Sequence, residues 1–197
     1  TAMQNMLNIA QENSNKLSQL INDLLDIDKL VAGKMQFDFS ACSMLDLLKQ
    51  SIEHNQPYAD KYQASITLTA QQDAAVLLDP MRFHQIMANL LSNAAKFSPI
   101  GSDIQVNLSQ TDSEIQVSVQ DQGPGISVDF QQRMFEKFSQ ADSADARSKD
   151  GTGLGLAIVK EIATQHGGKL EILENIYQES PLKYGTCMRV YLPVGTP

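Results

Sequence analysis

Asn89, Asn93 and Lys96 are separated by four and then three residues in a stretch of helical periodicity, which places all three on one face of a helix. An amide oxygen can ligate Mg²⁺, which usually keeps several waters and bridges phosphates, and a lysine one turn further along can reach the same phosphates. A solvated polar face is the commoner explanation for any single helix, so the spacing alone leaves both interpretations open. Another side of this helix is apolar and fits a core: Ile86, Leu90, Leu91 and Ala94.

The segment Asp121-Gln-Gly-Pro-Gly125 directly follows an alternating stretch that is typical of a strand. A carboxylate at a strand end can accept a hydrogen bond from an exocyclic amine such as adenine N6. The glycines would let the backbone lie close against a flat base. An ordinary Asp-Gly turn has the same composition, so this segment alone does not decide between the two.

Three alternate glycines in Gly151-Thr-Gly-Leu-Gly-Leu156 run into Ala157–Ala163, an apolar segment with helical spacing. Glycine permits positive φ and a close approach of the backbone to a ligand. A helix N-terminus offers unpaired N–H groups and partial positive charge to a phosphate. The alternative is a loop that only needs flexibility before a helix.

The elements that must position these residues can be predicted from periodicity. Asp79 as N-cap and Pro80 in the first turn start the helix with the two asparagines, which runs to about Phe97. Strands are predicted at 65–69, 75–78 (buried), 104–108, 115–119, 169–175 and 184–192. Further helices are predicted at 45–58, with a disturbance near Pro57, at 127–132, and from the glycine turn to about 166. Residues 139–150 are predicted to form a surface loop. The order predicts an α/β (α+β) two-layer sandwich, with helices on one face of a mixed or antiparallel sheet.

A long N-terminal helix precedes this sandwich. Apolar residues from Met3 to Val31 recur at alternating spacings of four and three, as in a coiled coil, and Gly33 supplies a C-terminal stop. One helix cannot bury its own apolar stripe, so we expect another helix, another subunit or both to cover it. Packing on its own domain is the open alternative.

Composition limits the kinds of partner. The 197 residues suffice for one domain with a core and an extra element, and no apolar run approaches the ~20 residues of a membrane span. The net charge of −8 disfavours a broad nucleic-acid surface, although a few local cations could hold a small anion. Cys42 and Cys187 lack metal-ligand spacing and are expected to be reduced and buried in a cytosolic protein.

Four motifs together resemble, in order and with sensible gaps, the N, G1, F and G2 boxes of the ATP-binding domain of sensor histidine kinases. They are Asn89-Leu-Leu-Ser-Asn93-Ala-Ala-Lys96-Phe97, Asp121-Gln-Gly-Pro-Gly125, Phe135-Glu-Lys-Phe138 and Gly151-Thr-Gly-Leu-Gly155. Gly185-Thr186 looks like the last glycine box, Lys29-Leu-Val-Ala-Gly-Lys34 resembles the exit of the second dimerisation helix, and Phe138-Ser-Gln-Ala-Asp142 is similar to hybrid-type kinases. The resemblance covers essentially the whole chain.

The resemblance implies a Bergerat-type ATP-binding fold and not a P-loop fold, whose G-x-x-x-x-G-K-[ST] motif the chain lacks. It also implies a division of the chain into three parts. Residues 1–33 would be the second helix of the dimerisation and phosphotransfer hairpin, and residues 34–40 a linker. Residues 41–197 would be the catalytic ATP-binding domain.

The same resemblance implies ATP and Mg²⁺ as cofactors. Asn93 would coordinate Mg²⁺, and Asn89 and Lys96 would be catalytic through the metal and the phosphates. Asp121 would bind adenine N6, and Thr186 would support a water network beside the base. The implied nucleotide-contacting set is Asn89, Asn93, Lys96, Phe97, Asp121, Gly123, Gly125, Ile126, Gly151, Thr152, Gly153, Leu154, Gly155, Leu156 and Thr186.

Residues 139–150 would form an ATP lid hinged on the following glycines and anchored by the apolar packing of Phe135 and Phe138. Lys137 and Gln140 stand where relatives often carry arginine. Arg147 and Lys149 are therefore candidate substitutes for the lid contacts to the γ-phosphate.

The resemblance implies a protein histidine kinase of two-component signal transduction. Related gyrase, chaperone and mismatch-repair ATPases have a glutamate at the Asn89 position, and an amide cannot take a proton from water as that carboxylate does. None of His54, His84 and His166 has the family's acceptor context, so the phosphoacceptor is expected on a first dimerisation helix upstream of Thr1. This fragment would then bind ATP without completing autophosphorylation.

Expected partners are ATP or ADP, a second copy of the chain through the N-terminal helix, and a response regulator or receiver domain, without nucleic acid. The fragment is expected to be cytoplasmic and not membrane-inserted, whether or not an inner-membrane anchor exists in the parent protein. A nucleotide-binding regulatory module without kinase activity and a related Bergerat-fold ATPase or serine kinase are the alternatives left open.

Overall fold

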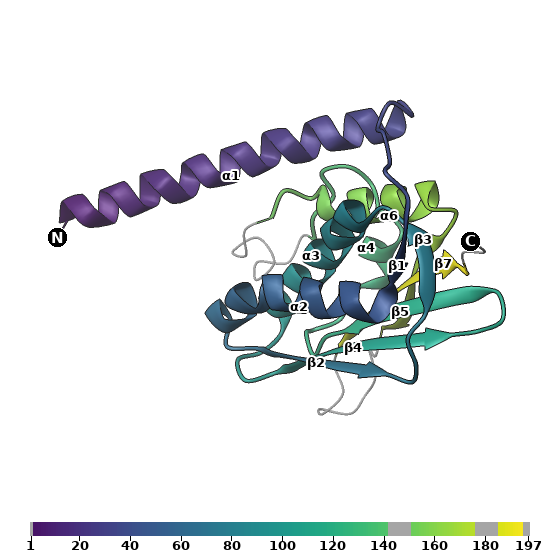
Figure 1. Ribbon diagram of the computed structural model, residues 1–197. Helices are drawn as coiled ribbons and strands as arrows, with labels where there is room; N and C mark the ends of the chain where they lie inside the picture. Colours follow the sequence, from purple (N-terminus) through teal and green to yellow (C-terminus); the bar gives the residue numbers. More distant parts are fainter. Residues whose placement is uncertain (1, 142–150, 176–184, 195–197) are drawn as a thin grey trace.

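A five-stranded mixed sheet forms one layer of the protein, which we describe from a computed structural model for residues 2–141, 151–175 and 185–194 (Figure 1). Its strand order is β2-β4-β5-β7-β6. The strands are β2 (Ser65–Ala70), β4 (Asp103–Gln110), β5 (Glu114–Gln120), β7 (Thr186–Pro193) and β6 (Lys169–Asn175). β2 and β4 are parallel and the other neighbours are antiparallel, as a mixed sheet requires.

Three helices cover one face of this sheet: α2 (Met44–Lys61), α3 (Pro80–Phe97) and α6 (Gly155–Gln165) (Figure 1). Alternate residues of the central strands are buried beneath them, including Ile104, Val106, Ile115 and Val117. The predicted apolar side of α3 is also buried, and the Asp79 carboxylate caps this helix by accepting a hydrogen bond from Arg82 N–H at 3.1 Å. The predicted two-layer sandwich is therefore confirmed.

Smaller features differ from the prediction. β3 (Ala75–Leu78) pairs with β1 (Ser40–Ser43) in a separate two-stranded sheet, and Leu77 is 45% exposed, so β3 is half-buried and not buried throughout. α2 continues through Pro57, because Pro57 and Glu53 both lie on its exposed face, where water can replace the missing hydrogen bond. The short helix α4 spans Val128–Gln131.

Helix α1 (Ala2–Val31) is packed on its own domain at one end only. Its C-terminal part contacts α6 and buries Ile27 and Leu30, whereas its N-terminal end projects beyond the body (Figure 1). The other apolar residues of the stripe are exposed, among them Met3, Leu7, Leu17, Ile21 and Leu24. Packing on its own domain is therefore confirmed for one end of the helix, and the covering of the rest of the stripe by another helix or subunit stays a prediction.

No helix among the described residues has both the length and the apolarity needed to cross a membrane. Cys187 is buried and Cys42 is half-buried, and no disulfide joins these two described cysteines.

His166, directly after α6, joins three segments of the chain. Its Nε2 accepts a hydrogen bond from Asp79 N–H at 3.0 Å, so in the neutral ring Nδ1 carries the proton and donates it to Ile162 O at 2.8 Å. The rings of Phe37 and Phe39, in the segment before β1, lie 5.2 and 5.1 Å from the imidazole. His166 therefore has a structural role.

We expect this histidine to make stability depend on pH. Burial lowers the pKa of His166 below its ordinary 6.5, although the bond to Ile162 and the nearby Asp79 carboxylate act in the opposite direction. The unfolded chain therefore binds the proton more readily, and the free energy of unfolding should decrease as pH falls below about 6.5. Denaturant titrations at several values between pH 8 and 5 give the free energy of unfolding at each pH. This free energy should change less steeply with pH in His166→Gln than in wild type. The same pH dependence in wild type and His166→Gln would contradict this role of His166. His54→Gln, which replaces an exposed histidine, is the control.

Candidate functional site

The Asp121 carboxylate is fixed at the end of β5 by two backbone donors. Its Oδ1 accepts hydrogen bonds from Gly123 N–H at 2.7 Å and from Thr186 N–H at 3.1 Å. Both bonds use Oδ1, so a ligand amine would meet Oδ2. Burial raises the pKa of Asp121, while the two N–H donors lower it.

Two glycines allow three distant segments to meet around this carboxylate. A Cβ on Gly123 would lie 3.0 Å from Phe97 O at the end of α3, and a Cβ on Gly185 would collide with Asp121 O. Gly125 has φ +77°, which an L side chain rarely adopts. The close packing therefore depends on residues without side chains, and it joins α3, the turn after β5 and the start of β7.

The polar face of α3 lies against the glycine-rich turn before α6. Asn89 Nδ2 donates to Gln85 O at 2.9 Å, and a Cβ on Gly155 would lie 2.5 Å from Asn89 Oδ1. Lys96 is only 7% exposed; its Nζ lies 4.7 Å from the centre of the Phe97 ring and 3.0 Å from where a Cβ on Gly151 would be. The structure therefore brings an amide and a buried cation of α3 to the first and last glycines of this turn.

The glycine-rich turn has a fixed shape of its own. Gly153 has φ +70°, and a Cβ there would lie 2.7 Å from the carbonyl carbon of Phe138. Thr152 Oγ1 accepts a hydrogen bond from Leu154 N–H at 3.2 Å just before α6 begins. Gln140 Nε2 donates to Gly151 O at 2.8 Å, which ties the preceding segment to the same turn.

The prediction for Phe138 is wrong. Its ring is 59% exposed, and it is the Phe138 backbone that packs against Gly153. Phe135 is half-buried against the core, as expected. Arg147 and Lys149, the candidate lid cations, lie outside the described residues.

The predicted site residues thus form two connected groups. The first group lies around the Asp121 carboxylate and reaches Phe97 through Gly123; it also contains Thr186. The second group lies along α3, where Gly155 is next to Asn89 and Gly151 is next to Lys96. The two groups are connected because Lys96 and Phe97 are consecutive residues of α3. Three other predicted residues are placed by their elements: Asn93 is half-buried on α3 between Asn89 and Lys96, and Ile126 and Leu156 pack against the core.

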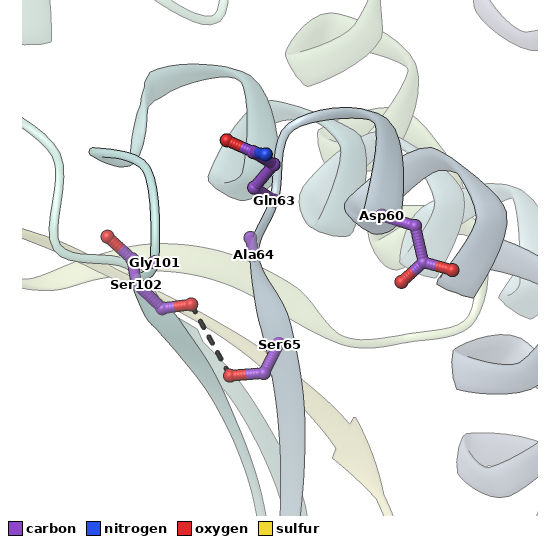
Figure 2. A pocket seen from close by; sticks show the side chains of 6 residues that line it. All are labelled: Asp60, Gln63, Ala64, Ser65, Gly101 and Ser102. Carbon is purple, nitrogen blue, oxygen red and sulfur yellow. Dashed lines mark hydrogen bonds between the residues drawn. The ribbon is translucent and has the colours of Figure 1, made fainter.

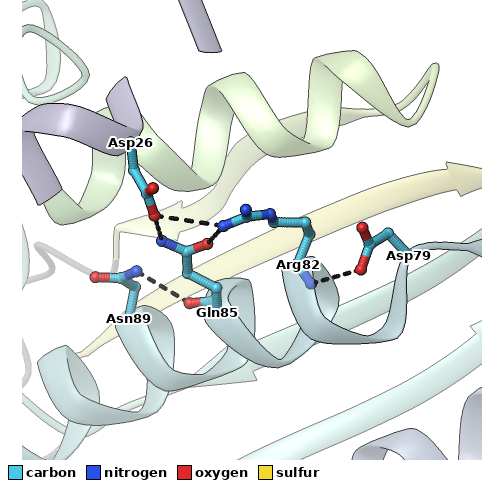
Figure 3. A network of polar contacts seen from close by, with 5 residues as sticks. All are labelled: Asp26, Asp79, Arg82, Gln85 and Asn89. Carbon is cyan, nitrogen blue, oxygen red and sulfur yellow. Dashed lines mark hydrogen bonds and ion pairs between the residues drawn. The ribbon is translucent and has the colours of Figure 1, made fainter. Parts of the chain in front are cut away.

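Helix α1 also contributes polar contacts near the site, which the sequence did not predict. Asp26 Oδ2 accepts hydrogen bonds from Arg82 Nη1 at 3.3 Å and Gln85 Nε2 at 3.0 Å, one turn before Asn89 on α3 (Figure 3). Asp28 pairs with Lys137 at 3.2 Å. No sequence signal pointed to these contacts, because acidic residues on a helix usually indicate only a solvated face.

A hollow elsewhere is a poorer candidate. It lies where α2 ends and β2 begins and is lined by Asp60, Gln63, Ala64, Ser65, Gly101 and Ser102 (Figure 2). None of these residues belongs to the motifs above, and the Ser65 hydroxyl is already used, donating to Ser102 O at 3.4 Å.

Residues 78–196 match the family model described as histidine kinase-, DNA gyrase B- and HSP90-like ATPase. The chain is 35% identical over 159 residues to the sensor-like histidine kinase SenX3 of Mycolicibacterium smegmatis, covering 81% of this chain and 41% of the relative. It is 38% identical over 173 residues to the signal transduction histidine-protein kinase BarA of Escherichia coli K12, covering 83% of this chain and 18% of that relative. The chain therefore spans less than half the length of these relatives.

Among solved structures, full-length ShkA in complex with AMPPNP superposes with a TM-score of 0.81 at 30% identity. The match covers all of this chain and 40% of ShkA. It therefore extends beyond the matched family region to helix α1.

The anchoring of Asp121 predicts an unusual effect of Asp121→Asn on stability. An amide oxygen can accept both backbone hydrogen bonds and removes a charge whose burial is unfavourable, so the midpoint of thermal unfolding at pH 7 should stay equal or rise. Because the raised pKa makes wild type relatively more stable in acid, the difference should shrink as pH falls toward 3.8.

Asp121→Ala is the matched comparison, since it leaves Gly123 N–H and Thr186 N–H without their acceptor and should lower the midpoint. Equal destabilisation by the asparagine and alanine substitutions at neutral pH would contradict this account.

Proposed function

The chain belongs to the family of histidine kinase-, DNA gyrase B- and HSP90-like ATPases, and we propose that it is the ATP-binding catalytic part of a sensor histidine kinase. The observation that carries this proposal is the joining of the two groups of site residues at Lys96 and Phe97. One group suits a purine and the other suits phosphates, and consecutive residues of one helix link them.

The group around Asp121 would bind adenine. Oδ1 is held by Gly123 and Thr186, which leaves Oδ2 to accept a hydrogen bond from the exocyclic amine. In Asp121→Asn, the amide oxygen would be retained by the two backbone donors, and its NH₂ would then face the N6 amine, donor against donor. Substitution should therefore abolish binding without unfolding the protein.

The residues on the polar face of α3 fit a Mg²⁺-bound triphosphate. The side-chain oxygens of Asn89 and Asn93 are neutral ligands of the kind Mg²⁺ accepts alongside water and phosphate, and Lys96 is a buried cation beside the turn. Bound Mg²⁺ would neutralise and orient the phosphates. Lys96 would hold a phosphate oxygen, and the turn at 151–155 would supply backbone N–H groups near the start of α6.

Asn89 favours transfer to an acceptor over hydrolysis. Its amide cannot remove a proton from water, and its Nδ2 donates a hydrogen bond to Gln85 O. In the proposed reaction an imidazole nitrogen attacks the γ-phosphorus, the bond from that phosphorus to the β–γ bridging oxygen breaks, and ADP leaves. The protein contributes position and charge neutralisation.

The acceptor histidine is proposed to belong to a preceding helix of the full protein. His166 uses both ring nitrogens in structural bonds, and His84 Nδ1 is bonded to Ser51 Oγ at 2.7 Å. Residues 1–33 would be the second helix of the dimerisation hairpin, whose exposed apolar residues would pack against the first helix and a second copy. A response regulator or receiver domain would then take the phosphoryl group.

Calorimetric titration tests the nucleotide site directly. Wild type should bind ADP and a non-hydrolysable ATP analogue saturably, the analogue more tightly with Mg²⁺, and Asp121→Asn should show no binding while remaining folded. Failure of wild type to bind either nucleotide would overturn the proposal and indicate a degenerate or closed site.

Phosphoryl transfer is tested in a longer protein that includes the preceding helix. Asn93→Ala should abolish Mg²⁺- and ATP-dependent labelling from γ-labelled ATP, because one amide ligand of the metal is lost. Ser92→Ala, a neighbouring substitution on the same helix, is the control and should remain labelled. Persistent labelling of Asn93→Ala would contradict the metal assignment, and an acid-stable label would contradict transfer to histidine.

A further inference from the structure

Asp23 is an acidic residue buried against the glycine-rich turn. It lies on α1, outside residues 78–196 that match the family model, and it is only 8% exposed. Its Oδ2 is 3.4 Å from Thr152 Oγ1. Because that hydroxyl accepts a hydrogen bond from Leu154 N–H, its proton is available to the Asp23 carboxylate.

Thr152 lies at the centre of the proposed phosphate site. On one side, the preceding Gly151 is next to the Nζ of Lys96. On the other side, α6 begins three residues later, with its N–H groups at that end. A carboxylate bound to Thr152 therefore occupies the electropositive region that would attract an incoming phosphate.

Neighbouring contacts hold Asp23 in this place. Asp26, one turn further along α1, bonds both Arg82 and Gln85 on α3 (Figure 3). Ile27 and Leu30 are fully buried on the same side of the helix. These contacts hold the α1 backbone beside the turn, so moving Asp23 far from Thr152 requires this end of α1 to move as well.

We propose that Asp23 of docked α1 belongs to the nucleotide site and lowers its affinity for polyphosphates, so that nucleotide phosphates and the docking of α1 oppose each other. This inference rests on the proposed ATP-binding function. In this proposal Asp23, which lies outside the region that matches the family model, controls the affinity for the phosphates of the nucleotide.

The opposition follows from charge. A buried carboxylate and a phosphate placed near the same turn repel each other, and the repulsion is poorly screened because Asp23 has little contact with water. Linkage makes the effect reciprocal: whatever docking does to phosphate affinity, phosphate binding does to docking. The base is not involved, because its proposed partner is Asp121, at the end of β5.

Asp23→Asn removes the charge while retaining the size of the side chain and an oxygen for the Thr152 hydroxyl. Asp28→Asn is the matched control: it makes the same change on the same helix, at an exposed residue paired with Lys137. Wild type and both variants would be titrated with adenosine, ADP and a non-hydrolysable ATP analogue in Mg²⁺.

We expect Asp23→Asn to bind the ATP analogue about tenfold more tightly than wild type, a size typical of coupled sites. The gain should be smaller for ADP, absent for adenosine and reduced at high salt. Asp28→Asn should match wild type. In hydrogen exchange of wild type, the ATP analogue should speed exchange in residues 23–30, and adenosine should not.

An unchanged affinity of Asp23→Asn for the ATP analogue would overturn the inference while leaving the proposed function intact. A gain of equal size for adenosine would also overturn it, since charge on the phosphates would then be irrelevant. Absence of any nucleotide binding, adenosine included, in all three proteins would overturn the proposed function and this inference together.

Discussion

The burial of the apolar side of α3 is the constraint on which the site depends. Phe83, Met87 and Leu91 are almost fully buried, and their packing fixes the rotation of the helix about its axis. With that rotation set, the helical repeat leaves only one direction for Asn89, Asn93 and Lys96. The same packing positions Phe97 O against the turn that follows Asp121. Core packing thus determines where the groups proposed for the phosphates and for the base lie.

Glycines complete the site because they allow backbone segments to lie close to α3 and to each other. Gly155 approaches Asn89, Gly123 approaches Phe97 and Gly185 approaches Asp121, each closely enough that a methyl group would force a rearrangement. The contacts of Gly155 and Gly185 each join residues more than sixty positions apart in the sequence. They also explain why the glycine motifs and the polar residues of α3 had to be interpreted together, since each alone fitted an ordinary turn or a solvated face.

The sequence predicted helices and strands well in segments with a clear helical or alternating pattern of apolar residues. The bounds of α3 and of the hairpin β4–β5 differ from the structure by at most two residues, because alternation, N-cap and turn signals agreed there. The pairing of β1 with β3, the exposed ring of Phe138 and the uninterrupted α2 depend on tertiary surroundings that local patterns do not contain. Likewise, the sequence of α1 does not indicate that Asp23 contacts Thr152 or that Asp26 contacts Arg82.

The charges of the site follow one logic when α1 is included. Lys96, Asp121 and Asp23 are each largely withdrawn from water, which is unfavourable for an isolated charge. Backbone donors partly compensate Asp121, and the Thr152 hydroxyl is positioned to serve Asp23. In the proposed site, a nucleotide would bring an amine to Asp121 and phosphates to Lys96, whereas its phosphates would repel Asp23. Of these three charged residues, Asp23 is the one that lies on α1, which is not part of the sheet or of the three helices that cover it.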